Sequence, residues 1–221
     1  MHPGHDRGAE LSRWRPGPRR LARLLVGLWM FGTGEALVVA ADLGNSPWTV
    51  FADGVSEQTP LSIGLATVAT SFVLLLIWIP LGERPGLGTL LNAIVVGVAI
   101  DVMLLVLGDA PLSVRVVELL GGIALVGIGS GLYINAALGP GPRDGLMVGL
   151  HRRTGWPIGA VRAGIEVTAL VVGAVLGGTY GLGTVAFALL IGPAVAFALR
   201  KLPGRPERRG EPAGAAAAPR D

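Results

Sequence analysis

The fold is decided by a stretch that interrupts a long apolar sequence, Leu138-Gly139-Pro140-Gly141-Pro142-Arg143-Asp144-Gly145. A second version of this stretch lies 95 residues earlier and reads Leu43-Gly44-Asn45-Ser46-Pro47-Trp48-Thr49-Val50. Glycine and proline end helices and form tight turns, so each stretch breaks the apolar sequence at a defined point. The chain can therefore be described as two arms arranged around two matching breaks.

The composition indicates a membrane protein. Hydrophobic residues make up 51% of the chain and charged residues only 15%, whereas a soluble domain carries about 25% charge. The chain has no cysteine, which excludes disulfides and thiolate metal sites. Its pI of about 10.2 comes from basic residues that flank apolar segments, a pattern that reflects membrane topology rather than nucleic-acid binding.

Apolar segments of roughly 20 residues can cross the hydrocarbon core of a bilayer as helices. Six are predicted, at residues 21–41, 60–80, 87–107, 114–138, 157–178 and 182–199. The first is too long for a cleaved signal peptide. We expect residues 21–202 to form a single membrane domain, with a disordered basic tail at residues 1–20 and a second disordered tail at residues 203–221.

The distribution of Lys and Arg predicts the orientation of the spans. Both tails and the segment 139–156 carry arginines, whereas the segment 42–59 carries only acidic charges. Six spans with both termini in the cytoplasm place every basic segment inside and the acidic segment outside. The chain is therefore expected to cross the membrane with cytoplasmic N- and C-termini.

The two breaks belong to an internal repeat. A shift of 95 residues aligns residues 34–104 with residues 129–199 without a gap, and the Gly, Pro and Thr matches fall at the breaks. The units, about 21–108 and 114–202, each contain three spans, so they must enter the membrane from opposite sides. This predicts an all-α fold of two inverted three-helix repeats, as in many secondary transporters. A duplication that left only a structural scaffold is the alternative.

Each unit also contains an extra helix after its first span, at residues 47–58 and 142–153. Twelve helical residues reach only about 18 Å, too short to cross. Asn45 or Ser46 is expected to N-cap the first of these helices, with Pro47 at its first position. The helices could be re-entrant or could lie flat at the interface. The sequence hardly separates the two, with a slight preference for a flat or partly dipping helix.

Ionisable side chains inside the spans are candidates for function, because each costs about 2.5–3.5 kcal/mol at mid-membrane. Four residues qualify, namely Glu35, Asp101, Arg162 and Glu166. Arg162 and Glu166 are four residues apart and can share a helix face. We predict a buried network of these two residues with Glu35 or Asp101. It could bind a substrate or couple protons, or it could only hold helices together, and the sequence weighs these equally.

Three further polar residues complete the hypothetical substrate- or ion-binding set. Asn135 lies within a span and can hydrogen-bond across helices. Arg143 and Asp144 begin a helix, where Asp144 can stabilise the helix dipole and Arg143 can reach an anionic group. For this pair, capping and topology are favoured over ligand binding.

No enzymatic chemistry is expected. The chain has three histidines, two in the N-terminal tail and one in a loop, so no metal cluster is predicted. The G-x-S-x-G and H-E-x-x-H patterns are absent. No catalytic residue, metal or cofactor is therefore assigned.

The sequence resembles the YczE-type bacterial integral membrane proteins, which are related to the broader YitT-like group. The resemblance covers about residues 21–202 and departs from the family at Thr49, where an acidic residue is usual. It implies a multi-pass protein of the bacterial inner membrane and no particular substrate. The residues that carry it are Leu43–Trp48, Gly88–Asn92, Asp101, Leu138–Met147, Thr154–Trp156, Val161-Arg162 and Gly164–Glu166.

Together these features predict a small transporter or permease for a small polar or anionic solute. The alternative is a membrane protein that transports nothing and assists or regulates a partner. The partners expected are the lipid bilayer and that solute, with no nucleic acid. The sequence does not determine the oligomeric state and leaves a homodimer open.

Overall fold

The computed structural model describes residues 13–202, and within them the chain is all helical. Six helices are long and apolar enough to span a membrane. The predicted spans are correct to within a few residues at each end. Most of the two predicted tails, residues 1–12 and 203–221, lies outside the described residues. The spanning helices are α2 (Pro18–Ala41), α4 (Ile63–Leu81), α5 (Leu87–Leu104), α6 (Leu112–Ala136), α8 (Ile158–Val175) and α9 (Leu182–Lys201).

Two short helices, α3 (Pro47–Gln58) and α7 (Pro142–Thr154), follow the first span of each half. Each begins with proline at its first position, where the missing N–H costs nothing. Ser46 stands at the N-cap of α3, but its hydroxyl accepts no hydrogen bond from the helix. The predicted N-cap position is thus confirmed at Ser46, although its hydroxyl does not cap the helix and is used in the site described below.

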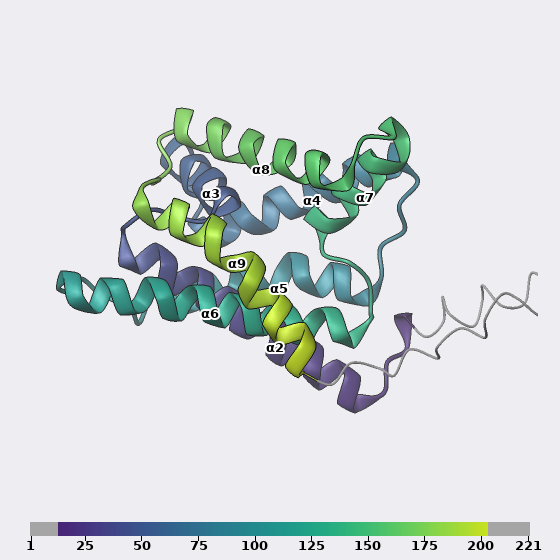
Figure 1. Cartoon of the computed structure of the whole chain (residues 1–221), viewed down its shortest axis with the longest axis horizontal. Coiled ribbons are helices and arrows are strands. Elements are labelled where there is room, and N and C mark those ends of the chain that lie inside the picture. The colour runs from purple at the N-terminus through teal and green to yellow at the C-terminus, as the bar shows by residue number, and fades with distance from the viewer. Residues whose placement is uncertain (1–12, 203–221) are drawn as a thin grey trace, which may run out of the picture.

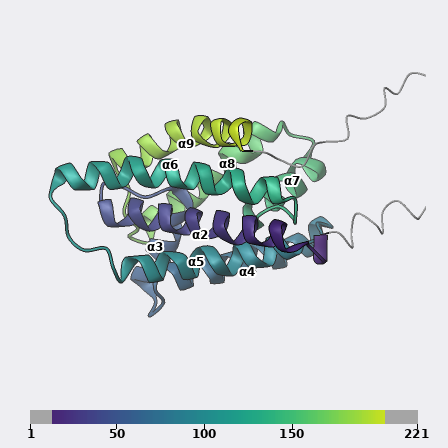
Figure 2. The same ribbon diagram turned by 90° about the horizontal axis from the view of Figure 1, so that it is seen from below.

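The centre of the molecule is the contact between α2 and α6, which lie side by side (Figures 1 and 2). Four glycines allow this approach: Gly27 faces Gly129, and Gly34 faces Gly122. A Cβ atom added to any of them would fall 2.6–2.9 Å from the carbonyl oxygen of the facing glycine. Small residues let spanning helices approach closely and gain dispersion energy in lipid, where apolar burial supplies little drive.

The two breaks have the same backbone conformation. Asp42 and Ala137 end their helices at φ of 48° and 52°, and Gly44 and Gly139 follow at 114° and 122°. In each break the leucine carbonyl accepts a hydrogen bond from the third span of the other half. The N–H of Gly88 donates to Leu138 at 2.8 Å. In the same way, the N–H of Gly183 donates to Leu43 at 2.7 Å.

Two arginines, also 95 residues apart, complete the same arrangement at the helix ends. The Arg115 guanidinium donates to the last carbonyl of α2, that of Ala41. Arg20 donates to the last carbonyl of α6, that of Ala136, at 3.0 and 3.2 Å. Each cation lies at the negative end of a helix dipole and satisfies carbonyls that have no partner within the helix.

The short helices lie among the spanning helices. Helix α3 contacts α4 and α8, and α7 contacts the same two. Most of the first eight residues of α3 are buried, and only its last turn is exposed. This packing favours the re-entrant interpretation over a helix lying flat on the membrane.

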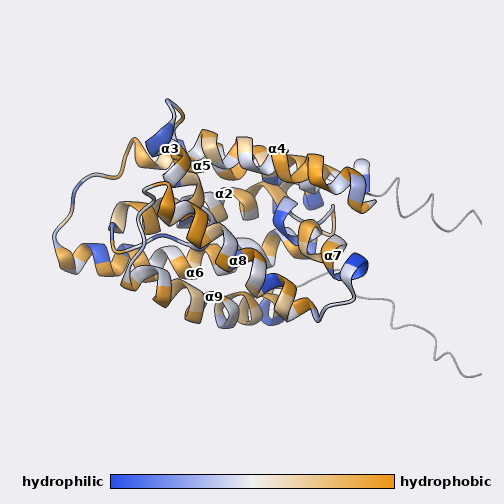
Figure 3. Ribbon diagram, turned by 90° about the horizontal axis from the view of Figure 1, so that it is seen from above, coloured by the Kyte–Doolittle hydropathy of each residue, from blue (hydrophilic) through white to orange (hydrophobic). Residues whose placement is uncertain are grey.

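Figure 3 shows hydrophobic residues along the spanning helices and hydrophilic residues gathered at helix ends and around α7.

Candidate functional site

A cavity of about 300 Å³ lies between the two halves. We call residues 95 positions apart counterparts. For much of the lining, both members of a counterpart pair are present. Nine such pairs line the cavity: Phe31/Val126, Glu35/Ser130, Ser46/Gly141, Pro47/Pro142, Trp48/Arg143, Thr67/Arg162, Ser71/Glu166, Asn92/Phe187 and Val96/Ile191.

Glu35 is held at the cavity wall by the start of α3. Its side chain is 2% exposed, and its carboxylate accepts hydrogen bonds from the hydroxyls of Ser46 at 2.9 Å and Thr49 at 2.8 Å. The carboxylate thus lies at the N-terminus of a helix, where the dipole stabilises negative charge. These contacts explain how a carboxyl group remains inside a bundle of apolar spans.

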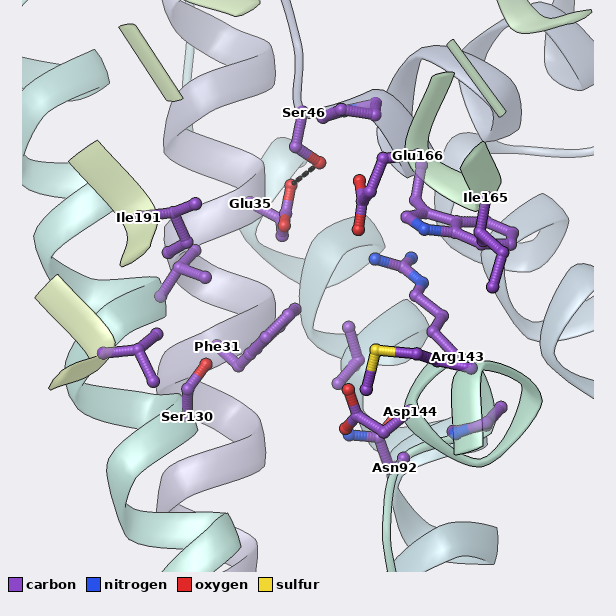
Figure 4. A pocket seen from close by; sticks show the side chains of 18 of the residues that line it. Phe31, Glu35, Ser46, Asn92, Ser130, Arg143, Asp144, Ile165, Glu166 and Ile191 are labelled. Carbon is purple, nitrogen blue, oxygen red and sulfur yellow. Dashed lines mark hydrogen bonds between the residues drawn. The ribbon is translucent and has the colours of Figure 1, made fainter. Parts of the chain in front are cut away.

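Arg143, the second residue of α7, carries its guanidinium into the cavity. Its Cζ atom lies 5.0 Å from the centroid of the Trp48 ring, a distance typical of a cation–π contact. Figure 4 shows the guanidinium pointing toward the carboxylates of Glu35 and Glu166, whose charges act on it together with that of Asp144. Within residues 13–202 no hydrogen bond or ion pair satisfies its N–H groups.

A second donor near Arg143 also has no acceptor. The indole N–H of Trp48 is buried and makes no hydrogen bond to any part of the chain that the structure describes. A buried polar group without a partner costs about 1–3 kcal/mol, so such groups call for an explanation. Arg143 and Trp48, which both line the cavity, thus carry donors that have no acceptor among the described residues.

The floor of the cavity is built by Asp144 and Tyr133. The Tyr133 hydroxyl donates to the Asp144 carboxylate at 2.7 Å, which links α6 to the first turn of α7. Asn92 lies close to Asp144 (Figure 4). This end of the cavity therefore offers carboxylate and amide groups, whereas Arg143 offers donors.

The predicted network of Arg162, Glu166 and a second acid is not found among the described residues. Arg162 is exposed and Glu166 half-buried, and both line the cavity from α8 without an ion pair. Arg162 was the only basic residue among the four ionisable residues predicted inside the spans. The prediction missed that α7 brings Arg143 to the cavity, where its guanidinium points toward Glu35 (Figure 4).

Two of the predicted site residues lie elsewhere. The Asp101 carboxylate accepts from the Ser62 hydroxyl at 2.6 Å and from the Gly64 N–H at 2.8 Å, which connects α5 to the start of α4. The Asn135 amide donates to the Leu202 carbonyl at 3.2 Å, at the end of α9. Neither lines the cavity. Of the seven predicted residues, the structure brings together Glu35, Arg143, Asp144, Arg162 and Glu166.

Four residues of the site were not predicted from the sequence: Ser46, Trp48 and Tyr133, which line the cavity, and Thr49, whose hydroxyl donates to Glu35. The repeat itself contains a signal for one of them, because Trp48 is the counterpart of Arg143. If the halves are related by a two-fold axis, counterparts near that axis face each other. Tyr133 has no such signal, since it lies in an apolar span and is polar only at its hydroxyl.

Comparison with known proteins places the chain in a family. Residues 18–200 match a family of unknown function, DUF6198. The chain belongs to this family. An uncharacterized protein of Haemophilus influenzae is 41% identical over 192 residues, covering 86% of this chain and 88% of the relative. The uncharacterized membrane protein YczE of Bacillus subtilis is 35% identical over 179 residues, covering 78% and 82%.

The predicted resemblance to YczE-type membrane proteins is thereby confirmed. A third relative, the uncharacterized protein YyaS of Bacillus subtilis, is 26% identical over 164 residues, covering 72% of this chain and 82% of the relative. No solved structure matches the chain. These relatives support a membrane protein and carry no activity in their names, so function has to be argued from the cavity.

The side chains at this cavity are suited to binding a small polar molecule. The cavity gathers guanidinium and indole donors beside carboxylates, in a space between apolar helices. In residues 13–202 no group of three or more His, Cys, Asp or Glu side chains could hold a metal ion. The charged groups come from both halves, so a bound molecule would contact both.

Proposed function

We propose that the protein is a transporter or permease for a small solute that carries an anionic group. The observation that supports this most strongly is Arg143, whose guanidinium lies in a cavity between two related halves and has no hydrogen bond or ion pair within residues 13–202. An intramembrane charge is costly and marks a substrate or ion pathway by default. Trp48 adds the unsatisfied N–H described above, and together the two can hold a carboxylate or phosphate oxygen.

The acidic residues restrict the solute further. Glu35 is already bonded to two hydroxyls, and Asp144 is bonded to Tyr133. Glu166 makes no hydrogen bond or ion pair within the described residues and faces the same space as Arg143 (Figure 4). A zwitterion, with its anionic group at Arg143 and a cationic group at Glu166, fits the arrangement best. Simple carboxylates and phosphates would use the Arg143 end alone.

Transport also requires access from both sides, and the repeat architecture supplies a basis for it. The glycine contacts of α2 with α6, the two Leu–Gly hydrogen bonds and the two arginine caps all occur in reciprocal pairs. This reciprocity supports two inverted three-helix repeats related by an axis in the membrane plane. In transporters of that kind the solute site lies at the repeat interface, as this cavity does.

The inverted topology can be tested at two exposed counterparts, Thr59 and Thr154. Because the chain has no cysteine, each of the single variants Thr59→Cys and Thr154→Cys contains one thiol, at the introduced position. In intact cells an impermeant maleimide should label the first, and it should label the second only in inverted vesicles. This follows if both termini are in the cytoplasm, inside the bacterial inner membrane. Labelling of both from one side would rule out inversion.

Transport itself can be tested without knowing the solute. Proteoliposomes would be loaded with a mixture of amino acids, small carboxylates and phosphate esters. Mass spectrometry would follow the loss of each compound, with protein-free liposomes as the control. We expect at least one zwitterion or anion to leave faster through the protein. If none does, and the purified protein instead retains another membrane protein, the accessory role is favoured and transport is wrong.

A further inference from the structure

The two halves differ in one contact, and that contact lies at the side of the cavity. Helix α4 packs along α5, whereas their counterparts α8 and α9 make no comparable contact. Figure 1 shows α8 and α9 diverging from the loop that joins them, toward the end of the bundle where α7 lies. Both helices nevertheless line the cavity, α8 through Arg162 and Glu166 and α9 through Phe187 and Ile191. The cavity is therefore open between them.

Glycines show how the closed contact is made in the first half. Gly64 of α4 lies against Gly97 of α5, so closely that a Cβ on either would collide with the carbonyl oxygen of the other. Their counterparts are Gly159 of α8 and Gly192 of α9, and these have no atom within 4 Å of such a Cβ. Both halves thus have glycine at the same two positions, although only one half uses them.

A glycine in a helix interior destabilises the helix relative to alanine. At Gly64 and Gly97 that cost is offset by close packing. At Gly159 and Gly192 no close packing offsets this cost in the described structure. Gly159 shares a helix face with Arg162 and Glu166, three and seven positions along, and that face is directed to the cavity. The unused glycines are thus placed where α8 would meet α9.

We propose that α8 is a gate of the cavity, which closes when its N-terminal half moves onto α9 and Gly159 packs against Gly192. The gate serves the transport proposed above, but its existence can be tested without measuring flux. The far end of α8 acts as the pivot. There Gly173 lies against the backbone of Val50 and Phe51 in α3, whereas the first seven residues of α8 are exposed apart from Val161.

The first half carries a polar contact that holds its helices closed. Asp101 of α5 accepts from Ser62 and from the N–H of Gly64, at the start of α4. The counterparts of Asp101 and Ser62 are Ala196 and Pro157, which cannot form these bonds. Both halves thus have the two glycines, but only the first half has the Asp101 hydrogen bonds that hold its helices together. This difference makes α8, and not α4, the helix that moves.

The test uses pairs of nitroxide labels on introduced cysteines, with pulsed EPR distances measured in lipid. One pair is placed at Ala160 and Leu189, on α8 and α9, and the matched pair at their counterparts Leu65 and Ile94. The second pair should give a single short distance. The first pair should give a long distance, matching the described structure, together with a shorter population similar to that of the second pair.

Three variants decide the interpretation. Gly159→Leu has room in the described structure and should remove the shorter population, whereas Gly164→Leu, on another face of the same helix, should leave it unchanged. Transfer of the Asp101 contact, by Pro157→Ser with Ala196→Asp, should make the shorter population dominant. A single long distance in both the unmodified chain and this double variant would overturn the gate, as would a short population that survives Gly159→Leu.

A change in the other half provides a test that does not depend on the double variant folding. Asp101→Ala removes the acceptor of Ser62 and Gly64, and the label pair at Leu65 and Ile94 should then acquire a longer distance. If that pair keeps its single short distance, Asp101 does not hold α4 closed, and the explanation for the asymmetry is wrong.

Discussion

Gly122→Leu should prevent the protein from folding stably, because the substitution falls where α2 and α6 touch. A Cβ at Gly122 would meet the carbonyl oxygen of Gly34 at 2.6 Å and a methyl group of Val38 at 2.9 Å. Neither the backbone nor the buried valine can move without separating the two central helices. Overpacking of this kind costs typically about 1–3 kcal/mol, and a larger side chain on backbone atoms costs more. We expect a large loss of folded protein in detergent.

The neighbouring residue is the matched control. Gly121 has no atom within 4 Å of an added Cβ and is exposed on the outer face of α6. Gly121→Leu should therefore be neutral or slightly stabilising, since leucine favours a helix over glycine by up to about 1 kcal/mol. Thermal unfolding followed by tryptophan fluorescence measures both variants. Equal unfolding temperatures for the two would mean that the α2–α6 contact is wrong.

The spans could be predicted from the sequence because each is decided by its own composition. A run of 20 apolar residues has few alternatives to a membrane helix, and the glycine and proline of each break end that helix locally. The glycine-rich segment at residues 127–131 lies within one of these spans, where small residues favour close helix packing. In the structure Gly127 and Gly131 face α9 and Gly129 faces α2.

The residues that line the cavity were harder to predict, because they depend on the position of α7. Arg143 follows a proline at the start of a short helix, where capping and topology explain an arginine locally. Its contact with Trp48 joins residues 95 positions apart and requires both short helices to lie within the bundle. Asp101 shows the opposite error. An acid within a span indicates function by default, but here neighbouring hydroxyl and N–H groups bind it.

Arg143→Gln should abolish most transport while the protein still folds. The substitution keeps a polar side chain, although a shorter one, and removes the charge and the planar donor group that faces the cavity. A hydrogen bond to a charged group contributes about 1.5–3 kcal/mol, which corresponds to a loss of roughly 10- to 150-fold in flux at low solute concentration. The measurement is the initial rate of loss, from proteoliposomes, of the compound identified in the mixture experiment.

Arg143→Lys separates charge from geometry at the same position. Lysine keeps the positive charge but offers neither the planar stacking on Trp48 nor paired donors, so an intermediate rate is expected. Arg153 provides the control, because it is exposed and, in the part of the chain that the structure describes, its guanidinium donates only to the Pro80 carbonyl, at 3.2 Å. Arg153→Gln should transport at the normal rate. If Arg143→Gln also transports normally, Arg143 does not bind the solute and its role is limited to packing against Trp48. The cavity would then have to bind through Glu166 and Arg162, the charges that α8 contributes from the moving side.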